Sequence, residues 1–280
     1  MKFGKMRTRG ASNPAPSLRI CCANAANYLE RLTEKSSVVH CITNTVTVND
    51  CANAVLAVGA RPVMAEHPRE TAQITAAAGA LLINTGSLTD SKIAAMKESA
   101  RSAKEHNIPF VLDCVGIASS DVRYETVKEL LEINIPDIIK GNASEITALC
   151  KGVMSDCGVD ATGTADETAV RAFAKQHGSV IVVTGETDII TDGMRTVHVK
   201  NGCDMLTKVT GTGCMLGCIM AAVATVADKF SAAVYAAAIM GICGEIADGS
   251  RGTGTLRMSL MDNLSTITDK DISEKIKIEG

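Results

Sequence analysis

Val209-Thr210-Gly211-Thr212-Gly213-Cys214 is a polar turn punctuated by glycines, and the chain then continues without a charge as far as Ala227. Glycine lets the backbone turn tightly and approach a ligand with no Cβ in the way. The apolar run predicts a buried helix, whose first N–H groups have no partner within the helix and attract anions. We therefore expect a phosphate site here, with Gly211, Thr212, Gly213 and Cys214 as its catalytic segment.

Cys214 falls in the first turn of this predicted helix, where the positive end of the helix dipole favours a thiolate. The alternative is an ordinary glycine turn before a core helix. The stretch is not a P-loop, because Gly-x-x-x-x-Gly-Lys-Ser/Thr occurs nowhere in the chain. It is not a dinucleotide fingerprint either, because Leu216 occupies the place of the third glycine.

Short apolar runs that end in polar residues alternate with helical segments through most of the chain. This alternation predicts a parallel, doubly wound sheet. Helices are predicted over Asn49–Val58 and Thr89–His106. Asp188–Thr191 and Thr196–Val199, joined through Asp192-Gly193, predict an antiparallel hairpin at one edge. The other predicted strands are Val38–Ile42, Arg61–Met64, Ala80–Asn84, Pro109–Asp113, Asp137–Asn142 and Val180–Gly185.

The ends of these predicted strands carry polar side chains. In parallel sheets of this kind, ligands bind at the carboxyl ends of the strands. The glycine turn at Gly211 joins the same group, so we expect a single site along this edge. The polar strand ends are Thr43-Asn44, Asn84-Thr85, Asp113, Lys140-Gly141-Asn142 and Thr184-Gly185.

Two carboxylates converge on this edge. Asp113 terminates a strand, and Glu145 lies one helical turn after Asn142. Oxygen ligands near an anion site suit Mg²⁺, which often keeps waters between itself and the carboxylates. The alternative for Glu145 is a helix cap, with Asn142 as the N-cap residue. Lys140 and Thr184 are candidates for binding polyphosphate, one as a point charge and the other through its hydroxyl.

His40 and Met64 also lie at or near strand ends. We interpret His40 as a hydrogen-bonded structural histidine in preference to a general base. Met64 is either a core residue or part of an apolar pocket for a ring.

The bulk composition excludes several classes of protein. The 280 residues, 46% of them hydrophobic, suffice for one large domain. A net charge of −3 and 2% aromatic residues disfavour nucleic acid as a partner. The apolar runs Thr212–Ala227 and Phe230–Gly244 are shorter than the roughly 20 residues of a membrane span, so they predict buried helices.

Eleven cysteines are present without a single C-x-x-C pair, which disfavours a disulfide frame, a metal site or a thiol redox centre. Scattered core thiols fit a cytoplasmic protein. Residues 1–17 are basic and contain two prolines, so we expect a disordered extension in preference to a targeting segment. Residues 18–280 are then predicted to form a single domain.

Several stretches together resemble the hydroxyethylthiazole kinases, a family with the ribokinase-like fold. They occur in family order from about Val38 to Gly217. The resemblance implies a three-layer α/β/α domain whose sheet is mostly parallel, with the antiparallel hairpin at its edge. The matching stretches are His40-Cys41-Ile42-Thr43-Asn44 with Asn49-Asp50-Cys51-Ala52-Asn53, Gly59-Ala60-Arg61-Pro62-Val63-Met64-Ala65, Ile83-Asn84-Thr85-Gly86, Asn142-Ala143-Ser144-Glu145-Ile146, Val183-Thr184-Gly185-Glu186 and Thr210-Gly211-Thr212-Gly213-Cys214.

The family uses ATP and Mg²⁺ to phosphorylate the hydroxyl of 4-methyl-5-(2-hydroxyethyl)thiazole in thiamine salvage, and the resemblance implies this reaction. Met64 and Gly211 resemble the thiazole contacts, and Lys140 and Thr184 resemble the ATP contacts. The strand-end residues Asn44 and Asn142 are grouped with the thiazole and ATP contacts, respectively.

The resemblance also assigns Asp113 and Glu145 to the acidic pair around the metal. Cys214 holds the position where most ribokinase-like enzymes place an aspartate base. The family further implies a homotrimer whose thiazole pocket is shared between subunits. No nucleic-acid or membrane partner is expected.

The chain departs from the usual family residues at four positions: Cys114 replaces a proline, Ala118 a glycine, Tyr124 a threonine and Lys140 an arginine. Lysine at position 140 cannot form the two parallel hydrogen bonds to a phosphate that an arginine guanidinium can form. These departures bear on nucleotide affinity and choice more than on the reaction class. Two alternatives stay open: a related kinase of another ring alcohol such as hydroxymethylpyrimidine, and a non-catalytic regulator that binds thiazole or nucleotide.

Overall fold

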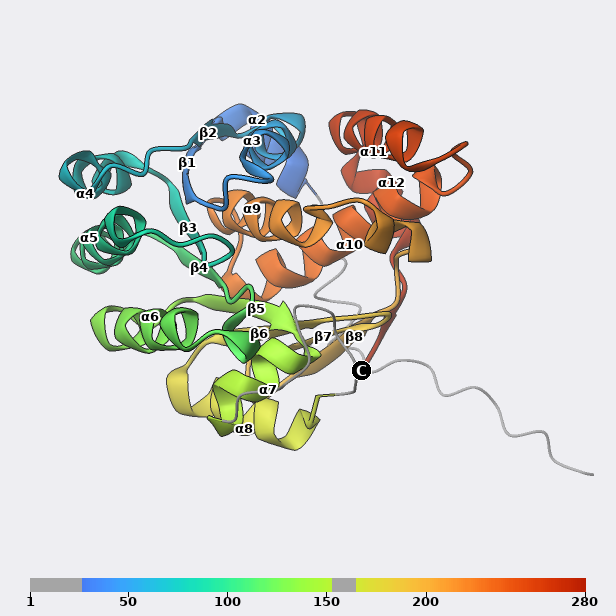
Figure 1. Cartoon of the computed structure of the whole chain (residues 1–280). Helices are drawn as coiled ribbons and strands as arrows, with labels where there is room; N and C mark the ends of the chain where they lie inside the picture. The colour runs from blue at the N-terminus through green and yellow to red at the C-terminus, as the bar shows by residue number, and fades with distance from the viewer. Residues whose placement is uncertain (1–26, 153–164) are drawn as a thin grey trace, which may run out of the picture.

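A nine-stranded sheet lies between two layers of helices in the computed structural model, which describes residues 27–152 and 165–280 (Figure 1). The extension expected over residues 1–17 lies outside the described residues. The strand order is β2-β1-β3-β4-β5-β6-β7-β8-β9. The first six strands in this order are parallel: β2 (Arg61–Val63), β1 (Val38–Ile42), β3 (Ala80–Asn84), β4 (Phe110–Asp113), β5 (Ile138–Asn142) and β6 (Val180–Thr184).

The sheet continues on the β6 side with antiparallel strands. The hairpin of β7 (Asp188–Thr191) and β8 (Thr196–Val199) has the bounds predicted from the sequence. Beyond it, the chain end adds β9 (Ile278–Glu279), which pairs with β8 and was not predicted. The prediction of a mostly parallel sheet with an antiparallel edge is confirmed.

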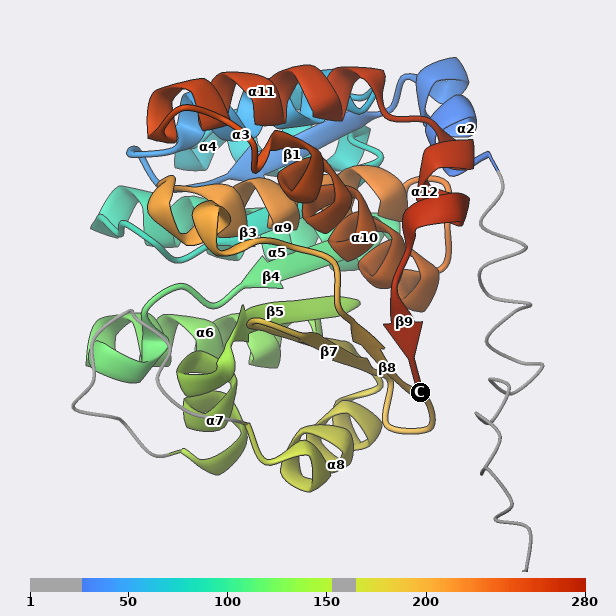
Figure 2. The same cartoon turned by 90° about the vertical axis from the view of Figure 1, so that its right-hand side faces the viewer.

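One helical layer covers each face of the sheet, as the turned view in Figure 2 also shows. The first layer contains α2 (Tyr28–Lys35), α3 (Val48–Ala57), α9 (Thr212–Ala224), α10 (Lys229–Ala247), α11 (Thr253–Thr266) and α12 (Asp269–Lys275). The second contains α4 (Pro68–Ala77), α5 (Asp90–His106), α6 (Asp121–Ile133), α7 (Ala143–Lys151) and α8 (Glu167–His177).

The central strands are apolar on both faces because both faces are covered. In β3, Leu82 belongs to the core under the first layer, and Leu81 and Ile83 belong to the core under the second. This alternation follows from the two-residue period of a strand.

The apolar runs near the C-terminus form core helices, as predicted. The longer one, α10, is apolar enough to span a membrane by composition, but 83% of its apolar window is buried inside the protein. Asp228 caps α10 by accepting from the backbone N–H groups of Phe230 and Ser231 at 3.1 Å each. Helix α9 packs on α3 and on the central strands, so its first turn lies above their carboxyl ends.

Candidate functional site

Asn44, Asn84 and Asp113 meet beneath Cys214, at the carboxyl ends of β1, β3 and β4. The side-chain amides of Asn44 and Asn84 donate to Sγ of Cys214 at 3.2 and 3.3 Å. Asn84 also donates to Oδ2 of Asp113 at 2.8 Å, since the two residues are register partners in β3 and β4. Residues far apart in the sequence therefore form one polar cluster under the start of α9.

A buried ion pair adjoins this cluster. Nζ of Lys140, on β5, lies 2.8 Å from Oδ1 of Asp113, and the two side chains are 5% and 0% exposed. Burial is the largest single effect and opposes the charged form of Lys140, but the charge and hydrogen bond of Asp113, with the neighbouring acidic groups, together raise the pKa of the ammonium. Burial raises the pKa of Asp113, whereas Lys140 and Asn84 favour its ionised form.

Glu145 is held by the backbone. Its Oε1 accepts from the N–H of Gly116 and its Oε2 from the N–H of Asn142, each at 2.7 Å. Asn142 Oδ1 accepts in turn from the N–H of Glu145 at 2.9 Å, which completes a capping box at α7. Burial raises the pKa of Glu145, although both backbone donors favour the carboxylate. The helix-cap interpretation is therefore confirmed, and it leaves a metal role open.

The carboxylates suit a water-mediated Mg²⁺ in preference to a closed metal cage. Within residues 27–152 and 165–280, no three His, Cys, Asp or Glu side chains are grouped closely enough to hold a metal ion. Each oxygen of Asp113 and Glu145 already accepts one hydrogen bond, and a carboxylate oxygen has a second lone pair for a metal-bound water. Such a donor set fits Mg²⁺, which keeps several waters and binds through substrate phosphates.

The glycine turn has the predicted form. Gly211 is the N-cap residue of α9 with a φ of 94°, in the left-handed region that favours glycine. A Cβ at Gly211 would lie 2.5 Å from Cγ2 of Thr47. A Cβ at Gly213 would lie 3.5 Å from Nζ of Lys140, so the turn reaches the buried cation. Thr212 uses its hydroxyl to donate to the carbonyl of Leu206 at 3.1 Å, which anchors the turn.

The prediction that the helix start favours a Cys214 thiolate is wrong. Burial, followed by the negative charge of Asp113, raises the pKa of this thiol, and the opposing effect of Lys140 is smaller. Desolvation of the thiol is thus the largest effect, and it disfavours the thiolate. Cys214 is a neutral thiol at physiological pH.

A groove of about 760 Å³ opens beside the turn, on the β6 side of Lys140. Its volume falls within the ~300–1,000 Å³ of small-molecule sites. Thr184 lies at the end of β6, where its hydroxyl donates to the carbonyl of Gly141 at 3.3 Å. The predicted site residues that line the groove are Asn142, Thr184, Thr212 and Gly213.

Sequence reasoning missed several residues of this groove. Asp188 lines it and accepts from the N–H of Gly185 at 3.0 Å, and burial raises the pKa of Asp188 to about 6. Asn201, Leu206 and Met240 line it from segments with no motif of their own.

Met64 and Asn44 lie apart from the groove, toward the β2 edge of the sheet, and do not line it. Asn44 is fixed by Thr47, whose N–H and hydroxyl donate to Asn44 Oδ1 at 2.9 and 3.0 Å. Met64 follows β2 and packs partly against the first core. The site residues thus form two groups, one on each side of the turn at Gly211.

Most of the sequence departures lie away from the groove. Cys114 and Ala118 are buried in the second core, where Cys114 is a thiol whose pKa is raised by burial. Tyr124 faces Lys128 on the surface of α6. Of the four departures, only Lys140 touches the polar cluster.

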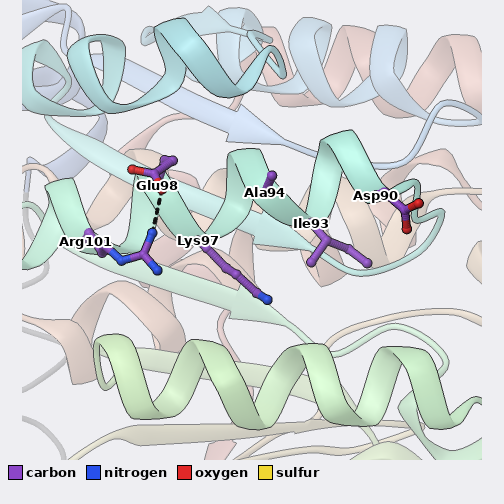
Figure 3. Close-up of a pocket in the computed structure, with 6 residues that line it drawn as sticks. All are labelled: Asp90, Ile93, Ala94, Lys97, Glu98 and Arg101. Carbon is purple, nitrogen blue, oxygen red and sulfur yellow. Dashed lines mark hydrogen bonds and ion pairs between the residues drawn. The ribbon is translucent and has the colours of Figure 1, made fainter.

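A second recess, of about 320 Å³, lies on the outer face of α5 (Figure 3). Its charged side chains pair with neighbours: Arg101 with Glu98 at 2.5 Å, and Lys97 with Glu129 at 2.7 Å. Exposed pairs of this kind contribute little to stability, about 0–1 kcal/mol. We do not assign a ligand to this recess.

Comparisons with known proteins identify the family of the chain. A family model described as the hydroxyethylthiazole kinase family matches residues 29–270. A Clostridium botulinum protein named hydroxyethylthiazole kinase 2 is 40% identical over 255 residues, covering 88% of this chain and 96% of that protein. The solved structure of a hydroxyethylthiazole kinase protein from Pyrococcus horikoshii has a TM-score of 0.82 at 32% identity, over 92% of this chain and 98% of that one.

A more distant structure confirms the predicted fold class. A ribokinase-like superfamily protein from Enterococcus faecalis has a TM-score of 0.60 over 86% of this chain and 92% of that one. At 13% identity, this similarity concerns the fold alone.

Proposed function

The chain belongs to the hydroxyethylthiazole kinase family, and on that premise we propose that it phosphorylates 4-methyl-5-(2-hydroxyethyl)thiazole in thiamine salvage. In the reaction, the hydroxyl oxygen bonds to the γ-phosphorus of ATP, the bond to the bridging oxygen breaks, and ADP and a proton are released. The observation that carries the proposal is the approach of the glycine turn to the buried cation, Gly213 to Lys140.

The groove is the proposed ATP site. Thr184 and Asn142 line it from two adjacent strand ends, and the positive charge of Lys140 lies behind Gly213, which also lines the groove. An ammonium paired with Asp113 stays charged in spite of its burial, which suits it to a phosphate.

The second group of residues is the proposed thiazole site, formed by Met64, Asn44 and Gly211. A thioether at the end of β2 offers an apolar, polarisable contact to an aromatic ring. Gly211 lies against Thr47, which fixes Asn44, so the turn borders this group of residues. The hydroxyl of the substrate then faces the start of α9 between the two sites.

Transfer depends on position and electrostatics more than on proton removal. The first N–H groups of α9, at Thr212, Gly213 and Cys214, have no partner within the helix and are the proposed donors to the transferring phosphoryl group. Cys214 is a poor base because burial raises its pKa, so we assign it a minor catalytic role.

Asp113 and Glu145 are the proposed anchors for Mg²⁺ through water. When bound, the ion neutralises charge on the polyphosphate of ATP. Lys140 and Asn84 favour the ionised form of Asp113 and oppose the effect of its burial. The backbone donors at Gly116 and Asn142 do the same for Glu145.

We also propose a cytoplasmic homotrimer. Large apolar side chains are exposed near the thiazole side: Val46 is 75% exposed, Leu56 55% and Met258 68%. The last two line an open groove of about 660 Å³ between α3 and α11. Contact with another subunit would cover this surface.

A coupled ADP-release assay with and without hydroxyethylthiazole tests the proposed reaction. The expected result is ADP formation that depends on the thiazole and saturates with it. Lys140→Met is the matched negative variant, because it removes the charge beside Gly213. Turnover of hydroxymethylpyrimidine without turnover of hydroxyethylthiazole would favour a kinase of another ring alcohol. Binding of hydroxyethylthiazole without any turnover would favour a non-catalytic regulator.

A further inference from the structure

The loop that carries Met64 is tied to the rest of the site by two buried side chains outside the proposed contacts. This loop, residues 64–67, connects β2 to α4 and has no regular hydrogen bonding of its own. Its neighbours on each side are His40, on β1, and Lys92, in the first turn of α5. Neither residue has a role in the reaction described above.

His40 holds the loop from inside the sheet. The side chain is fully buried, with Nδ1 2.8 Å from Oγ1 of Thr75 and Nε2 2.9 Å from the carbonyl oxygen of Ala65. A carbonyl only accepts, so Nε2 carries the proton and the Thr75 hydroxyl donates to Nδ1. Burial lowers the pKa of His40, which keeps this neutral form. The residue next to Met64 is thereby fixed to β1.

Lys92 holds the loop from the other side. Its side chain is 4% exposed, and Nζ lies 3.0 Å from Oε2 of Glu66. The same nitrogen donates to the carbonyl of Thr43 at 2.9 Å, one residue before Asn44. A single buried ammonium therefore joins the Met64 loop to the Asn44 turn. Burying a charge is unfavourable, and an apolar side chain would serve packing alone at least as well.

We propose that Lys92 and His40 are positioning residues for the ring end of the site. They fix the separation between Met64 and Asn44, and hence the affinity for the thiazole, and they act on neither the nucleotide nor the transferring phosphoryl group. This inference rests on the proposed function, since it takes Met64 and Asn44 as ring contacts.

Lys92→Met, Lys92→Arg and Lys97→Met form the decisive set. Lys92→Met removes the charge and both interactions with little change in volume, and Lys92→Arg restores the charge and the donors. Lys97→Met, on the same helix (Figure 3), breaks the exposed pair with Glu129 and is the control for loss of a lysine. His40→Leu removes the donor to Ala65, and His40→Gln returns an N–H to the place of Nε2.

The expected result is a change in KM for hydroxyethylthiazole without a comparable change in KM for ATP. Lys92→Met and His40→Leu raise KM for hydroxyethylthiazole about tenfold, which corresponds to about 1.4 kcal/mol. KM for ATP stays within about twofold, because the groove is on the other side of the turn. Lys92→Arg and His40→Gln recover most of the thiazole affinity, and Lys97→Met behaves as the unaltered protein. Equal loss for both substrates, or an unchanged thiazole KM, overturns the proposal.

Methyl-¹³C methionine NMR provides a readout without substrate. The signal of Met64 is expected to shift in Lys92→Met and not in Lys97→Met. If the unaltered protein neither binds nor phosphorylates hydroxyethylthiazole, the proposed function is wrong. A shift of the Met64 signal in Lys92→Met would still show that Lys92 determines the conformation of residues 64–67. A Met64 signal unmoved by Lys92→Met and His40→Leu overturns the positioning role in either case.

Discussion

The Nζ of Lys140 lies 2.8 Å from Oδ1 of Asp113, and both groups are almost completely removed from solvent. Asp113 terminates β4 and Lys140 lies on the neighbouring strand β5, where the two are register partners. This pair joins the proposed metal anchor to the proposed ATP contact, so its disruption is expected to affect both stability and catalysis.

Lys140→Met is expected to lower the free energy of unfolding by about 3–5 kcal/mol at pH 7, because it leaves a buried carboxylate without its cation. Without Lys140 the pKa of Asp113 rises further in the folded state, so protonation relieves the loss as pH falls. Urea unfolding at pH 7 and pH 5 measures the free energy of unfolding of this variant. The matched control is the double variant that combines Lys140→Met with Asp113→Asn. An equal loss in the double variant at pH 7 would contradict the explanation.

Each of the variants Asp113→Ala and Glu145→Ala is expected to lower kcat sharply and to leave the KM for thiazole near normal. The lower kcat corresponds to a loss of several kcal/mol in transition-state stabilisation, which is on the order of what a metal ion contributes. Glu145→Ala also removes the carboxylate that accepts from the N–H group of Gly116, which costs about 1–3 kcal/mol in stability. Steady-state kinetics over a range of Mg²⁺ concentrations checks the first effect. A stable Glu145→Gln variant with an unchanged rate would leave Glu145 as a helix cap alone.

Substitutions in the glycine turn separate the catalytic contribution of the backbone N–H donors from that of the Cys214 thiol. Cys214→Ala is expected to slow turnover by about 10²-fold or less, since a thiol of raised pKa is a poor base. Gly213→Pro removes one donor and is expected to cost about 10²–10³-fold. Cys214→Asp stays active, because a carboxylate there accepts the hydroxyl proton. Single-turnover kinetics at saturating thiazole separates these cases; an inert Cys214→Ala beside an active Gly213→Pro would reverse the assignment.

Alanine at the two glycines provides a structural check on the same turn. Gly211→Ala combines a positive φ with a contact to Thr47, so it is expected to destabilise the protein by about 1–3 kcal/mol. Gly213→Ala is expected to leave stability nearly unchanged, because its Cβ meets only Lys140 at ordinary contact distance. Thermal unfolding of both variants compares them directly, and equal losses would contradict the described geometry.

Asp188 is expected to give the protein a measurable pH dependence. Its folded pKa of about 6 exceeds its usual value of 3.8, so the folded state binds the extra proton between these pH values. This contribution to stability therefore increases as pH falls from 7 toward 4. Asp188→Asn keeps an acceptor for Gly185 and is expected to be more stable than the unaltered protein at pH 7, by up to about 3 kcal/mol. Denaturant unfolding without nucleotide, at pH 4.5 and pH 7, is the measurement; a difference independent of pH would contradict it.

Assembly is expected to depend on the apolar surface of α3 and α11. Light scattering at micromolar concentration should give a trimer for the unaltered protein. Met258→Glu places a charge on a side chain that is 68% exposed and is expected to weaken the trimer. Met194→Glu, at a similarly exposed methionine in the β7–β8 turn, is the control and should leave the trimer intact. A stable monomer in the unaltered protein would exclude the assembly.

The sequence by itself determined the parallel strands and the helices α3, α5, α9 and α10, because local periodicity and turn residues decide these elements. Its strand ends also identified Asn44, Asp113, Lys140 and Thr184, since polar residues after buried strands collect at one edge of a parallel sheet. The short strand at Ile278 escaped prediction because two residues carry no pattern, and only pairing with β8 defines them.

Only the tertiary structure decided the charge states and the grouping of side chains. The thiol of Cys214 has a raised pKa because burial disfavours the thiolate, and burial is a property of the packed molecule. The contacts of Lys92 with Thr43 and Glu66 join segments that are distant in the sequence, and no local pattern encodes them. Sequence patterns specify which residues end each strand, whereas desolvation and long-range contacts, which exist only after folding, set what those residues do.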